Sequence, residues 1–463
     1  MQNIIDQATQ KIKKGFEDFF SGEDISIDKA EITLTQLCFK VIGELLGELY
    51  EEKDRQIRED KESRRGKLTV ERRNDRKSIL TVFGEVNYSR TYYRKASGGY
   101  DYPVDSVVGI DSHERLSYGT AMALVDCARY ESYGKSSEHV LEGKVSRQTV
   151  MNKLREAQRH EEKVCDIKKK IPVLHIDADE DHVAMQDGRN VQVPLATIYE
   201  GVDRSADRHR CINAFSVSRY GLSSEEFWQE VYTEIDNRYD LTNTKVYLHG
   251  DGAEWIQEGL EWLPRGTVFV RDRYHVSKYI LTAVSGMEED DVFLYQRSIR
   301  SSLKDDNSDR LADLMAKMLE KYPDREETIV RGIGYLINFF DAIHIKYIDK
   351  EARCGSSEPH VQHVLSQRLS TIPMGWSDET LKHLVPLLSG SSFYLSKEVP
   401  EDLPVEEEPG LSCEGVNRMI RKLGRKKIRN SLGMTDPDKA VCLPATQYKK
   451  TALGKILMEL SRV

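Results

Sequence analysis

The spacing of apolar residues changes character along the chain, from helical to strand-like and back. Between residues 29 and 60, apolar residues recur every three to four positions, which predicts one long amphipathic helix. Residues 67–95 are rich in Thr, Val and Tyr, and Gly84 marks the turn of a predicted basic β-hairpin. Residues 117–160 return to helical spacing, whereas strands and helices alternate from Ile171 onward. A largely helical first part with one hairpin therefore precedes a longer α/β part.

The second half of the helical stretch has the features of a helix-turn-helix. Gly143 permits a tight turn, and Ser146 can cap the helix that follows. Apolar residues form the inner stripe of that helix, so Arg147, Gln148 and Lys153 are expected to point outward. Such outward residues can contact DNA, although a helical hairpin with a purely structural role has the same pattern.

The string VLHIDADEDHV at residues 173–183 is the clearest chemical signal. It places Asp177 and Asp179 two residues apart on a predicted strand, where alternation points both side chains to one face. The residues expected on the opposite, buried face are Leu174, Ile176 and Ala178. Carboxylates repel one another and resist dehydration, so several on one strand favour a divalent cation. An acidic strand end exposed to water would explain this string alone equally well.

The order of elements after residue 171 predicts the fold class. The acidic strand ends at a predicted hairpin turn, Asp187-Gly188, and two further strands follow. A helix, the strand KVYLHGD, a second helix and the strand TVFVRD complete the series. This is the order of an RNase H-like core. Residues 272–350 have mainly helical spacing. We therefore predict an α/β RNase H-like catalytic core with a helical insertion, preceded by a β-hairpin and a helix-turn-helix-like helical domain.

Two further acids lie where they could meet the acidic strand. Asp251 follows a predicted strand directly, and Gly252 allows close approach of backbone or ligand, but capping of the next helix is the simpler role. Glu358 precedes Pro359 at a helix start and should face the sheet, where it could equally serve the helix N-terminus. Three acids on two strands and a helix could hold two Mg²⁺ ions that promote phosphodiester exchange.

Charge and composition restrict the class of protein. The 463 residues, 31% of them charged, carry a net charge of −9 and contain no apolar run long enough to span a bilayer, so we expect a soluble, cytoplasmic protein. Basic clusters at 61–77 and 418–429 can bind DNA phosphates or form solvated helix faces. The seven cysteines lack CxxC spacing, which argues against a zinc ribbon or a disulfide framework. His360 and His363 lack other zinc-ligand signals and are expected on a helix surface.

A set of motifs together resembles the ISLre-type transposases of bacterial insertion sequences. The resemblance covers residues 65–380, in order. Its motifs are TVFGEVNYSRTYYR, SYGKSSEHV with VSRQTV, LHIDADEDHV, HGDGAEWI, RDRYHVSKYI and GSSEPHVQHVLSQRLSTIPMGWS. It implies an RNase H-like DDE transposase, which cleaves DNA at the ends of its own mobile element and joins the freed 3′-OH to a target.

The resemblance also implies roles for individual residues. Asp179, Asp251 and Glu358 match the acidic triad, which would hold two Mg²⁺ or Mn²⁺ ions. Asp177, on the same strand face, is a further candidate metal ligand and an alternative first acid. Related transposases with helical insertions carry a (C/D)xxH signature that His275 completes, so His275 is expected to support catalysis.

Transposition implies DNA partners and assembly. Two element ends must be held together, so we expect a homo-oligomer, associated with the nucleoid, that binds double-stranded terminal inverted repeats and target DNA. Arg72 and Arg73 of the hairpin join the helix-turn-helix residues as expected DNA contacts. The predicted regions are 1–65 (helical, a candidate oligomer interface), 66–105 (basic hairpin), 106–165 (helix-turn-helix-like), 171–375 (catalytic core, insertion at about 280–350) and 376–463 (helical, with a basic segment).

Two other classes of function fit parts of the pattern. An RNase H-like structure-specific nuclease would cut DNA without joining strands. A DNA-binding regulator would use only the helix-turn-helix, and its acids would be structural. A nucleotide hydrolase is disfavoured, because the phosphate-binding motif GxxxxGK[ST] is absent from the sequence.

Overall fold

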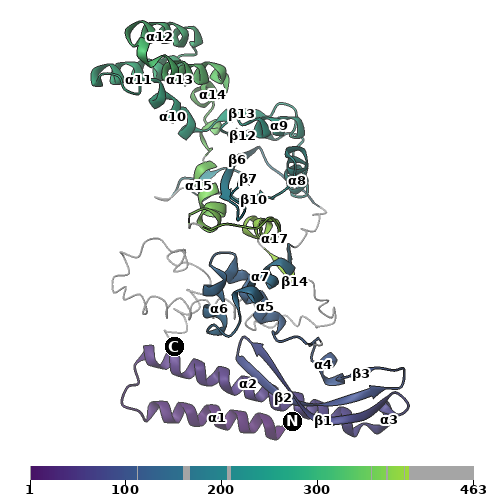
Figure 1. Ribbon diagram of the computed structural model, residues 1–463. Helices are drawn as coiled ribbons and strands as arrows, with labels where there is room; N and C mark the ends of the chain where they lie inside the picture. The colour runs from purple at the N-terminus through teal and green to yellow at the C-terminus, as the bar shows by residue number, and fades with distance from the viewer. Residues whose placement is uncertain are drawn as a thin grey trace. The chain divides into compact units, whose positions relative to one another are not determined.

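The computed structural model describes residues 2–111, 113–159, 167–205, 210–355, 357–371, 374–390 and 392–395, with the backbone alone at residues 2, 357 and 358. The predicted basic segment at 418–429 lies outside the described residues. The chain divides into two units, of which the first ends at Leu154 and the second spans Arg155–Ser396 (Figure 1). Among the described helices, none combines the length and the apolar character needed to cross a bilayer.

The first unit begins with a pair of helices packed on a strand. α1 (Gln2–Phe20) packs on α2 (Ile27–Glu59), which confirms the predicted long helix. α2 in turn packs on strand β2 (Gly84–Lys95). Their contact is close at Gly47, where an added Cβ would lie 2.4 Å from the carbonyl oxygen of Asn87. The long helix therefore packs within its own unit.

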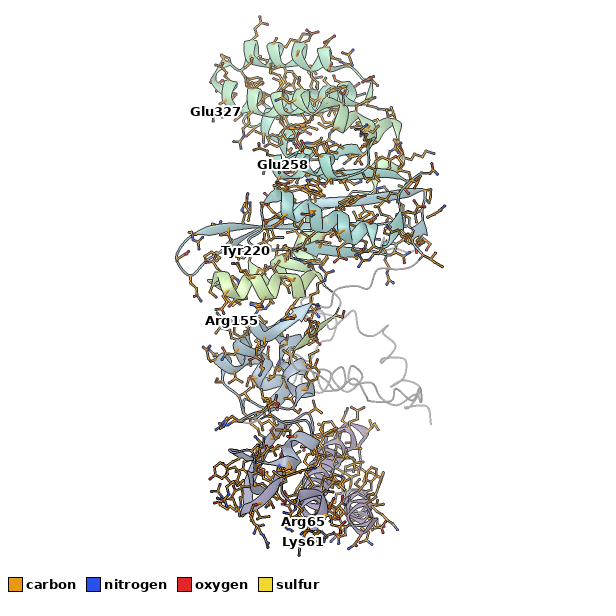
Figure 2. All side chains as sticks on the ribbon, turned by 90° about the vertical axis from the view of Figure 1, so that its right-hand side faces the viewer. Lys61, Arg65, Arg155, Tyr220, Glu258 and Glu327 are labelled. Carbon is orange, nitrogen blue, oxygen red and sulfur yellow. The ribbon has the colours of Figure 1, made fainter. Side chains whose placement is uncertain are left out.

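The predicted basic hairpin is confirmed. β1 (Leu68–Thr81) pairs antiparallel with β2, and Gly84 in the turn has a φ of +103°, which favours glycine. β3 (Tyr100–Asp101) pairs with the other edge of β2. The short helix α3 (Lys61–Arg64) precedes the hairpin, and its first residue, Lys61, is exposed (Figure 2).

Short helices complete the first unit. They are α4 (Pro103–Val107), α5 (Tyr118–Ala128), α6 (Tyr133–Leu141) and α7 (Arg147–Glu156). The turn before α7 contains Gly143 with a φ of +78°, and Ser146 Oγ accepts a hydrogen bond of 3.1 Å from the backbone N–H of Thr149. Val150 and Leu154 are fully buried. The predicted turn, cap and inner stripe are therefore present.

The second unit is built on a mixed five-stranded sheet in the order β10-β7-β6-β12-β13. Its strands are β6 (Val173–Ala184), β7 (Asn190–Tyr199), β10 (Phe215–Ser218), β12 (Lys245–Gly250) and β13 (Val268–Arg271). β7 is antiparallel to β6 and β10, whereas β12 is parallel to β6 and β13. Gly188, with a φ of +85°, lies in the hairpin turn between β6 and β7. The predicted strands and their order along the chain are confirmed.

The two faces of this sheet differ because alternation separates apolar from polar side chains. On one face, Leu174 and Ile176 lie in a core that includes residues of α8 (Ser224–Asp236) and α9 (Glu254–Trp262). The opposite, polar face of β6 lies on the side of α15 (Figure 1). The helices that contact the sheet from this side are α14 (Phe340–Ile348) at β13, α15 (Ser357–Val361) at β6 and α17 (Asp378–Ser389) at β10.

A helical insertion separates β13 from α15, as the sequence predicts. Before α14 it contains α10 (Arg273–Ala283), α11 (Glu289–Lys304), α12 (Ser308–Lys321) and α13 (Glu326–Asn338). These helices share a separate apolar core, and Glu327 of α13 is exposed (Figure 2). The short helical turns are η1 (Pro323–Arg325), η2 (Glu351–Arg353), the π-helical turn η3 (Gln362–Ser366) and α16 (Gln367–Leu369).

The region predicted to be helical at 376–463 also contains a strand, which the sequence pattern did not predict. β14 (Phe393–Leu395) pairs antiparallel with β4 (Ala157–Arg159). The segment that precedes the five-stranded sheet in the sequence and the segment that follows it therefore form one two-stranded ribbon. The remaining two-residue pairs are β5 (Lys169–Lys170) with β11 (Tyr239–Asp240) and β8 (Val202–Asp203) with β9 (Arg210–Cys211).

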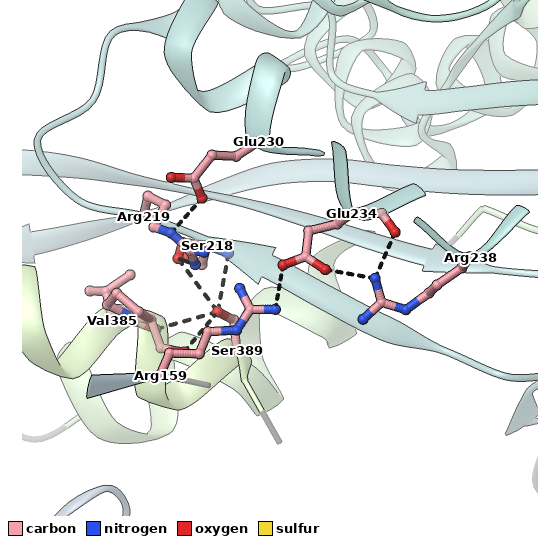
Figure 3. A network of polar contacts seen from close by, with 9 residues as sticks. Arg159, Ser218, Arg219, Glu230, Glu234, Arg238, Val385 and Ser389 are labelled. Carbon is pink, nitrogen blue, oxygen red and sulfur yellow. Dashed lines mark hydrogen bonds and ion pairs between the residues drawn. The ribbon is translucent and has the colours of Figure 1, made fainter. Parts of the chain in front are cut away.

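Polar contacts join this ribbon to α8 and join α17 to the sheet. Arg159 donates to Glu234 at 2.7 Å, and the backbone N–H of Ser218 donates to Ser389 Oγ at 3.1 Å (Figure 3). At the first turn of α17, Tyr220 donates to Asp378 at 2.5 Å; Figure 2 labels this tyrosine. Contacts from several elements thus position α17.

Candidate active site

A row of polar side chains follows one face of β6. His175, Asp177, Asp179 and Asp181 occupy alternate positions, and none is more than 9% exposed. Because they share a face and are buried, their charges must be compensated by hydrogen bonds, by proton uptake or by a cation. The alternative interpretation of this string, an acidic strand end exposed to water, does not describe these buried side chains.

Strand β12 brings Asp251 close to Asp179. His249 is the register partner of Asp177, so the position two residues further on continues this parallel register toward Asp179. Gly250, the residue between His249 and Asp251, lies against Ala178. A Cβ added to Gly250 would be 3.1 Å from the carbonyl oxygen of Ala178. Neighbouring strands are about 4.8 Å apart, so Asp251, which follows the last residue of β12, lies beside Asp179 in the middle of β6.

The local structure at Asp251 differs from a helix cap. Ala253, not Asp251, is the N-cap of α9, and its N–H donates a hydrogen bond of 2.8 Å to Asp251 Oδ1. Gly252 has a φ of +81°, and an added Cβ would lie only 1.4 Å from Arg271 Nη1. Glycine is therefore required at this point, and the tight turn holds the carboxylate at the strand end.

The electrostatics of Asp179 are those of a buried carboxylate with other acids nearby. Burial raises the pKa of Asp179 to about 7; the N–H of Glu180 opposes this effect, while the charges of Glu180 and Asp251 add to it. His275 lowers the pKa of Asp179. These groups are therefore near one another, and a divalent cation beside Asp179 would favour its ionised form.

His275 lies in the first turn of α10. Asp272 caps this helix by accepting a 2.6 Å hydrogen bond from the N–H of Tyr274, and its Oδ1 lies 3.7 Å from His275 Nδ1. A side-chain interaction with Asp272 raises the pKa of His275 against the effect of burial, and Asp251 and Asp179 raise it further. The described residues thus bring His275 within electrostatic reach of both acids.

Glu358, the third predicted acid, is placed only by its backbone. It lies in α15, which packs against β6. Its side chain lies outside the described residues. Val361, three residues further along α15, is buried.

Asp177 has partners of its own. Its Oδ1 accepts a hydrogen bond of 3.1 Å from Tyr199 Oη, and its Oδ2 lies 3.4 Å from His360 Nε2. Burial tends to lower the pKa of His360, but Asp177 and Cys211 outweigh it and raise this pKa to about 9. The expectation that His360 lies on a helix surface is therefore wrong, because it packs toward the sheet; His363, by contrast, is exposed.

Two buried histidines on the same face were not singled out from the sequence. His175 Nδ1 and His249 Nε2 are 3.2 Å apart, and both rings are fully buried. Burial lowers the pKa of both, that of His249 to about 3, so both are neutral at pH 7. The alternation of side chains along this strand could have identified His175, because it shares the periodicity of Asp177 and Asp179.

The predicted DNA-binding residues all lie in the first unit. Arg147 and Gln148 are exposed in the first turn of α7, and Lys153 is half-buried. Arg72 and Arg73 are exposed on β1. Arg72 Nε donates to Asp75 at 2.6 Å, and the guanidinium lies over the ring of Tyr92.

Comparison with known proteins shows one family. A family profile described as "Uncharacterised protein family (UPF0236)" matches residues 21–393. A UPF0236 protein from Caldanaerobacter subterraneus subsp. tengcongensis is 36% identical over 392 residues, covering 84% of this chain and 82% of the relative; its name joins eleven locus labels.

Further relatives carry the same family name. Another UPF0236 protein of that organism, whose name joins four locus labels, is 34% identical over 392 residues, covering 84% of this chain and 82% of its own length. A UPF0236 protein from Streptococcus gallolyticus, named for its place in the vanSb 3′ region, is 27% identical over 285 residues, or 58% of this chain and 62% of the relative.

Proposed function

The chain belongs to the UPF0236 family, and we propose that it is a DDE-type DNA transposase with an RNase H-like catalytic core. The observation that carries the proposal is that Asp251, directly after β12, lies beside Asp179 in the middle of the parallel neighbour β6, in a desolvated site. α15, which carries Glu358, packs against one of these strands. The order of strands and helices is the one expected of an RNase H-like core, and it supports this assignment.

The donor set fits magnesium or manganese. Asp179 and Asp251 offer carboxylate oxygens, the ligands that these cations prefer, and Glu358 is the third candidate. The raised pKa of Asp179 fits this role, because cation binding would offset the cost of its buried charge. Two such ions, when bound, would activate an attacking hydroxyl and stabilise the leaving 3′ oxygen.

The chain's other residues would orient the site. His275, held by Asp272 at the start of α10, would contact the scissile phosphate, and the interactions that raise its pKa favour the protonated ring. Asp177, with its contacts to Tyr199 and His360, would fix α15 against β6 and so position Glu358. In this proposal Asp177 is a positioning residue, and Asp179 is the first metal ligand.

The relatives and the first unit support an action on mobile DNA. A relative whose name joins eleven locus labels of one strain is what an element that inserts copies of itself would leave behind. The turn, cap and exposed Arg147 and Gln148 of α7 are suited to a recognition helix, with Lys153 further along it. Arg73 is available to bind phosphate, whereas Arg72 would first have to leave Asp75.

Strand transfer with the DNA that flanks the gene tests this proposal. Full-length protein, Mg²⁺ and labelled duplexes that carry the flanking sequences should yield cleavage at an element end and a joined product. Asp179→Asn and Asp251→Asn should each lower both activities at least about 100-fold, because each removes a direct metal ligand, while DNA affinity persists. Asp313→Asn, an exposed acid of α12, is the matched control and should retain activity.

The possible outcomes separate the classes of function. Cleavage without joining, even with pre-cleaved ends, would indicate a structure-specific nuclease and contradict the transposase assignment. DNA binding with unchanged function in Asp251→Asn would indicate a regulator whose acids are structural.

A further inference from the structure

A second group of potential metal ligands lies on the polar side of the sheet, apart from Asp179 and Asp251. One ligand atom from each of His175, Glu351 and Cys354 lies within 4.8 Å of the other two. His175 is fully buried, Cys354 is half-buried and Glu351 is exposed, so the group reaches from the interior to the surface. An ion held by the exposed Glu351 would therefore lie next to the buried nitrogen.

The chain builds this group from two elements. His175 comes from the first residues of β6, whereas Glu351 begins the 3-10 turn η2 and Cys354 follows it. Side chains three residues apart lie on the same side of a 3-10 turn, and the N–H of Cys354 donates to the carbonyl of Glu351 at 3.1 Å. The turn thus presents a carboxylate and a thiol together toward the sheet.

The imidazole of His175 has one nitrogen in use and one without a hydrogen bond. Its Nδ1 lies 3.2 Å from Nε2 of His249, whereas its buried Nε2 makes no hydrogen bond in the described part of the chain. Nε2 lies 3.9 Å from Glu351 Oε2, which is too far for a hydrogen bond.

Two tautomers of this histidine pair are compatible with the 3.2 Å contact. Complete burial favours two neutral rings, of which one must donate and the other accept. If Nδ1 of His175 donates to His249, the lone pair of Nε2 faces the carboxylate of Glu351 and the thiol of Cys354. A cation in this space would bind that lone pair and replace the thiol proton.

We propose that His175, Glu351 and Cys354 bind a zinc ion. Nitrogen, sulfur and oxygen donors are the ligands of Zn²⁺, whose bond lengths of about 2.0–2.3 Å place tetrahedral ligands about 3.3–3.8 Å apart. Small movements of the exposed Glu351 and of Cys354 bring the observed group to that size. A water molecule would complete the tetrahedron.

The surroundings resemble the outer shell of a metal site. A metal-bound histidine usually donates its other N–H to a fixed acceptor, and His249 is placed to accept from His175. Arg204 Nη2 lies 3.8 Å from Cys354 Sγ, so a positive charge lies beside the sulfur that would bind the metal. The ion would join β6 to the segment between the helical insertion and α15, and so fix the approach of that helix.

Zinc binding by the full-length protein tests this inference. After removal of metal by a chelator, zinc chloride titrated against a chromophoric competitor should fill one tight site per chain. Cys354→Ser and Glu351→Gln should each weaken this site at least about 100-fold, because each removes a direct ligand. The matched control is Cys38→Ser, which changes another half-buried thiol, and its affinity should equal that of the unsubstituted chain.

Cobalt gives a second readout at the same site. Co²⁺ added in place of zinc should produce a thiolate-to-cobalt charge-transfer band that is absent from Cys354→Ser and present in Cys38→Ser. The absence of tight zinc binding would overturn the inference, as would zinc retained by both Cys354→Ser and Glu351→Gln. Asp179→Asn should keep its zinc, so this result is independent of the proposed DNA chemistry.

Discussion

Asp179→Asn should stabilise the metal-free protein at pH 8 while it removes a ligand of the proposed active site. Asp179 is 9% exposed, and burial raises its pKa from an ordinary value of 3.8 to about 7. The folded state therefore holds the ionised carboxylate at a cost in free energy at pH 8, and the neutral amide removes that cost.

The magnitude follows from linkage. A difference of about three pH units between the folded and unfolded pKa corresponds to about 4 kcal/mol. The N–H of Glu180 donates to Asp179 Oδ1 at 2.9 Å, and the amide oxygen of the variant would still accept this hydrogen bond. The new amide N–H₂ group needs partners, however, which offsets about 1–2 kcal/mol. We expect a net gain of about 2–3 kcal/mol in the free energy of unfolding.

The sign of the pH dependence is fixed by the direction of the pKa change. Below pH 3.8 the carboxyl is protonated in both states, so the two proteins should be equally sensitive to pH. Between pH 3.8 and about 7 the unfolded state loses its proton first, so the unsubstituted protein loses stability relative to Asp179→Asn. Above pH 7 the difference should be constant.

Urea unfolding of both proteins in EDTA, from pH 4 to 8, measures this difference. Asp313→Asn, which changes an exposed acid, should stay within about 0.5 kcal/mol of the unsubstituted protein. With Mg²⁺ at about 100 times its Kd, the unsubstituted protein should gain about 2.7 kcal/mol, and Asp179→Asn should gain much less. A variant that is no more stable than the unsubstituted protein at pH 8 in EDTA would refute the reasoning.

Three other perturbations have defined outcomes. Gly252→Ala should lower the free energy of unfolding by at least about 1–2 kcal/mol, because the φ of Gly252 is +81° and a Cβ there would overlap Arg271. The control is Gly334→Ala, because Gly334 lies in a helix and its added Cβ would meet no other atom; it should not be destabilising in the same urea titration. Ser146→Ala should cost about 1 kcal/mol of thermal stability and weaken DNA binding, since α7 loses its cap. His360→Gln should lower the free energy of unfolding by up to about 3 kcal/mol below pH 6.5, because it removes the ion pair with Asp177. The unsubstituted protein loses this contribution as the pH rises through about 9. A variant whose stability has the same pH profile as that of the unsubstituted protein would exclude the His360 ion pair.

The order of strands and helices in the second unit was predictable because its strands and turns carry strong local signals. β6 alternates apolar and polar residues over its whole length, and Gly188 ends it at a hairpin. The parallel strand β12 was also predictable, because a short apolar run precedes Asp251. The short strand β14 was missed, because three residues carry no usable periodicity and its partner β4 is more than two hundred residues away.

The candidate site was predictable only in its acids. Spacing places Asp177 and Asp179 on one face, but it cannot show that Asp177 contacts His360 from a helix far along the chain. The pairing of His175 with His249 depends on the register of β6 and β12, which no local pattern determines. Glu351 and Cys354 join them only because a 3-10 turn follows the helical insertion.

The cation site itself is the central claim, and anomalous diffraction tests it most directly. A crystal of the full-length protein soaked in Mn²⁺ should show an anomalous peak about 2 Å from carboxylate oxygens of both Asp179 and Asp251. Soaked crystals of Asp251→Asn should lose that peak. Manganese bound elsewhere, with both carboxylates free of metal, would contradict the proposed catalytic centre.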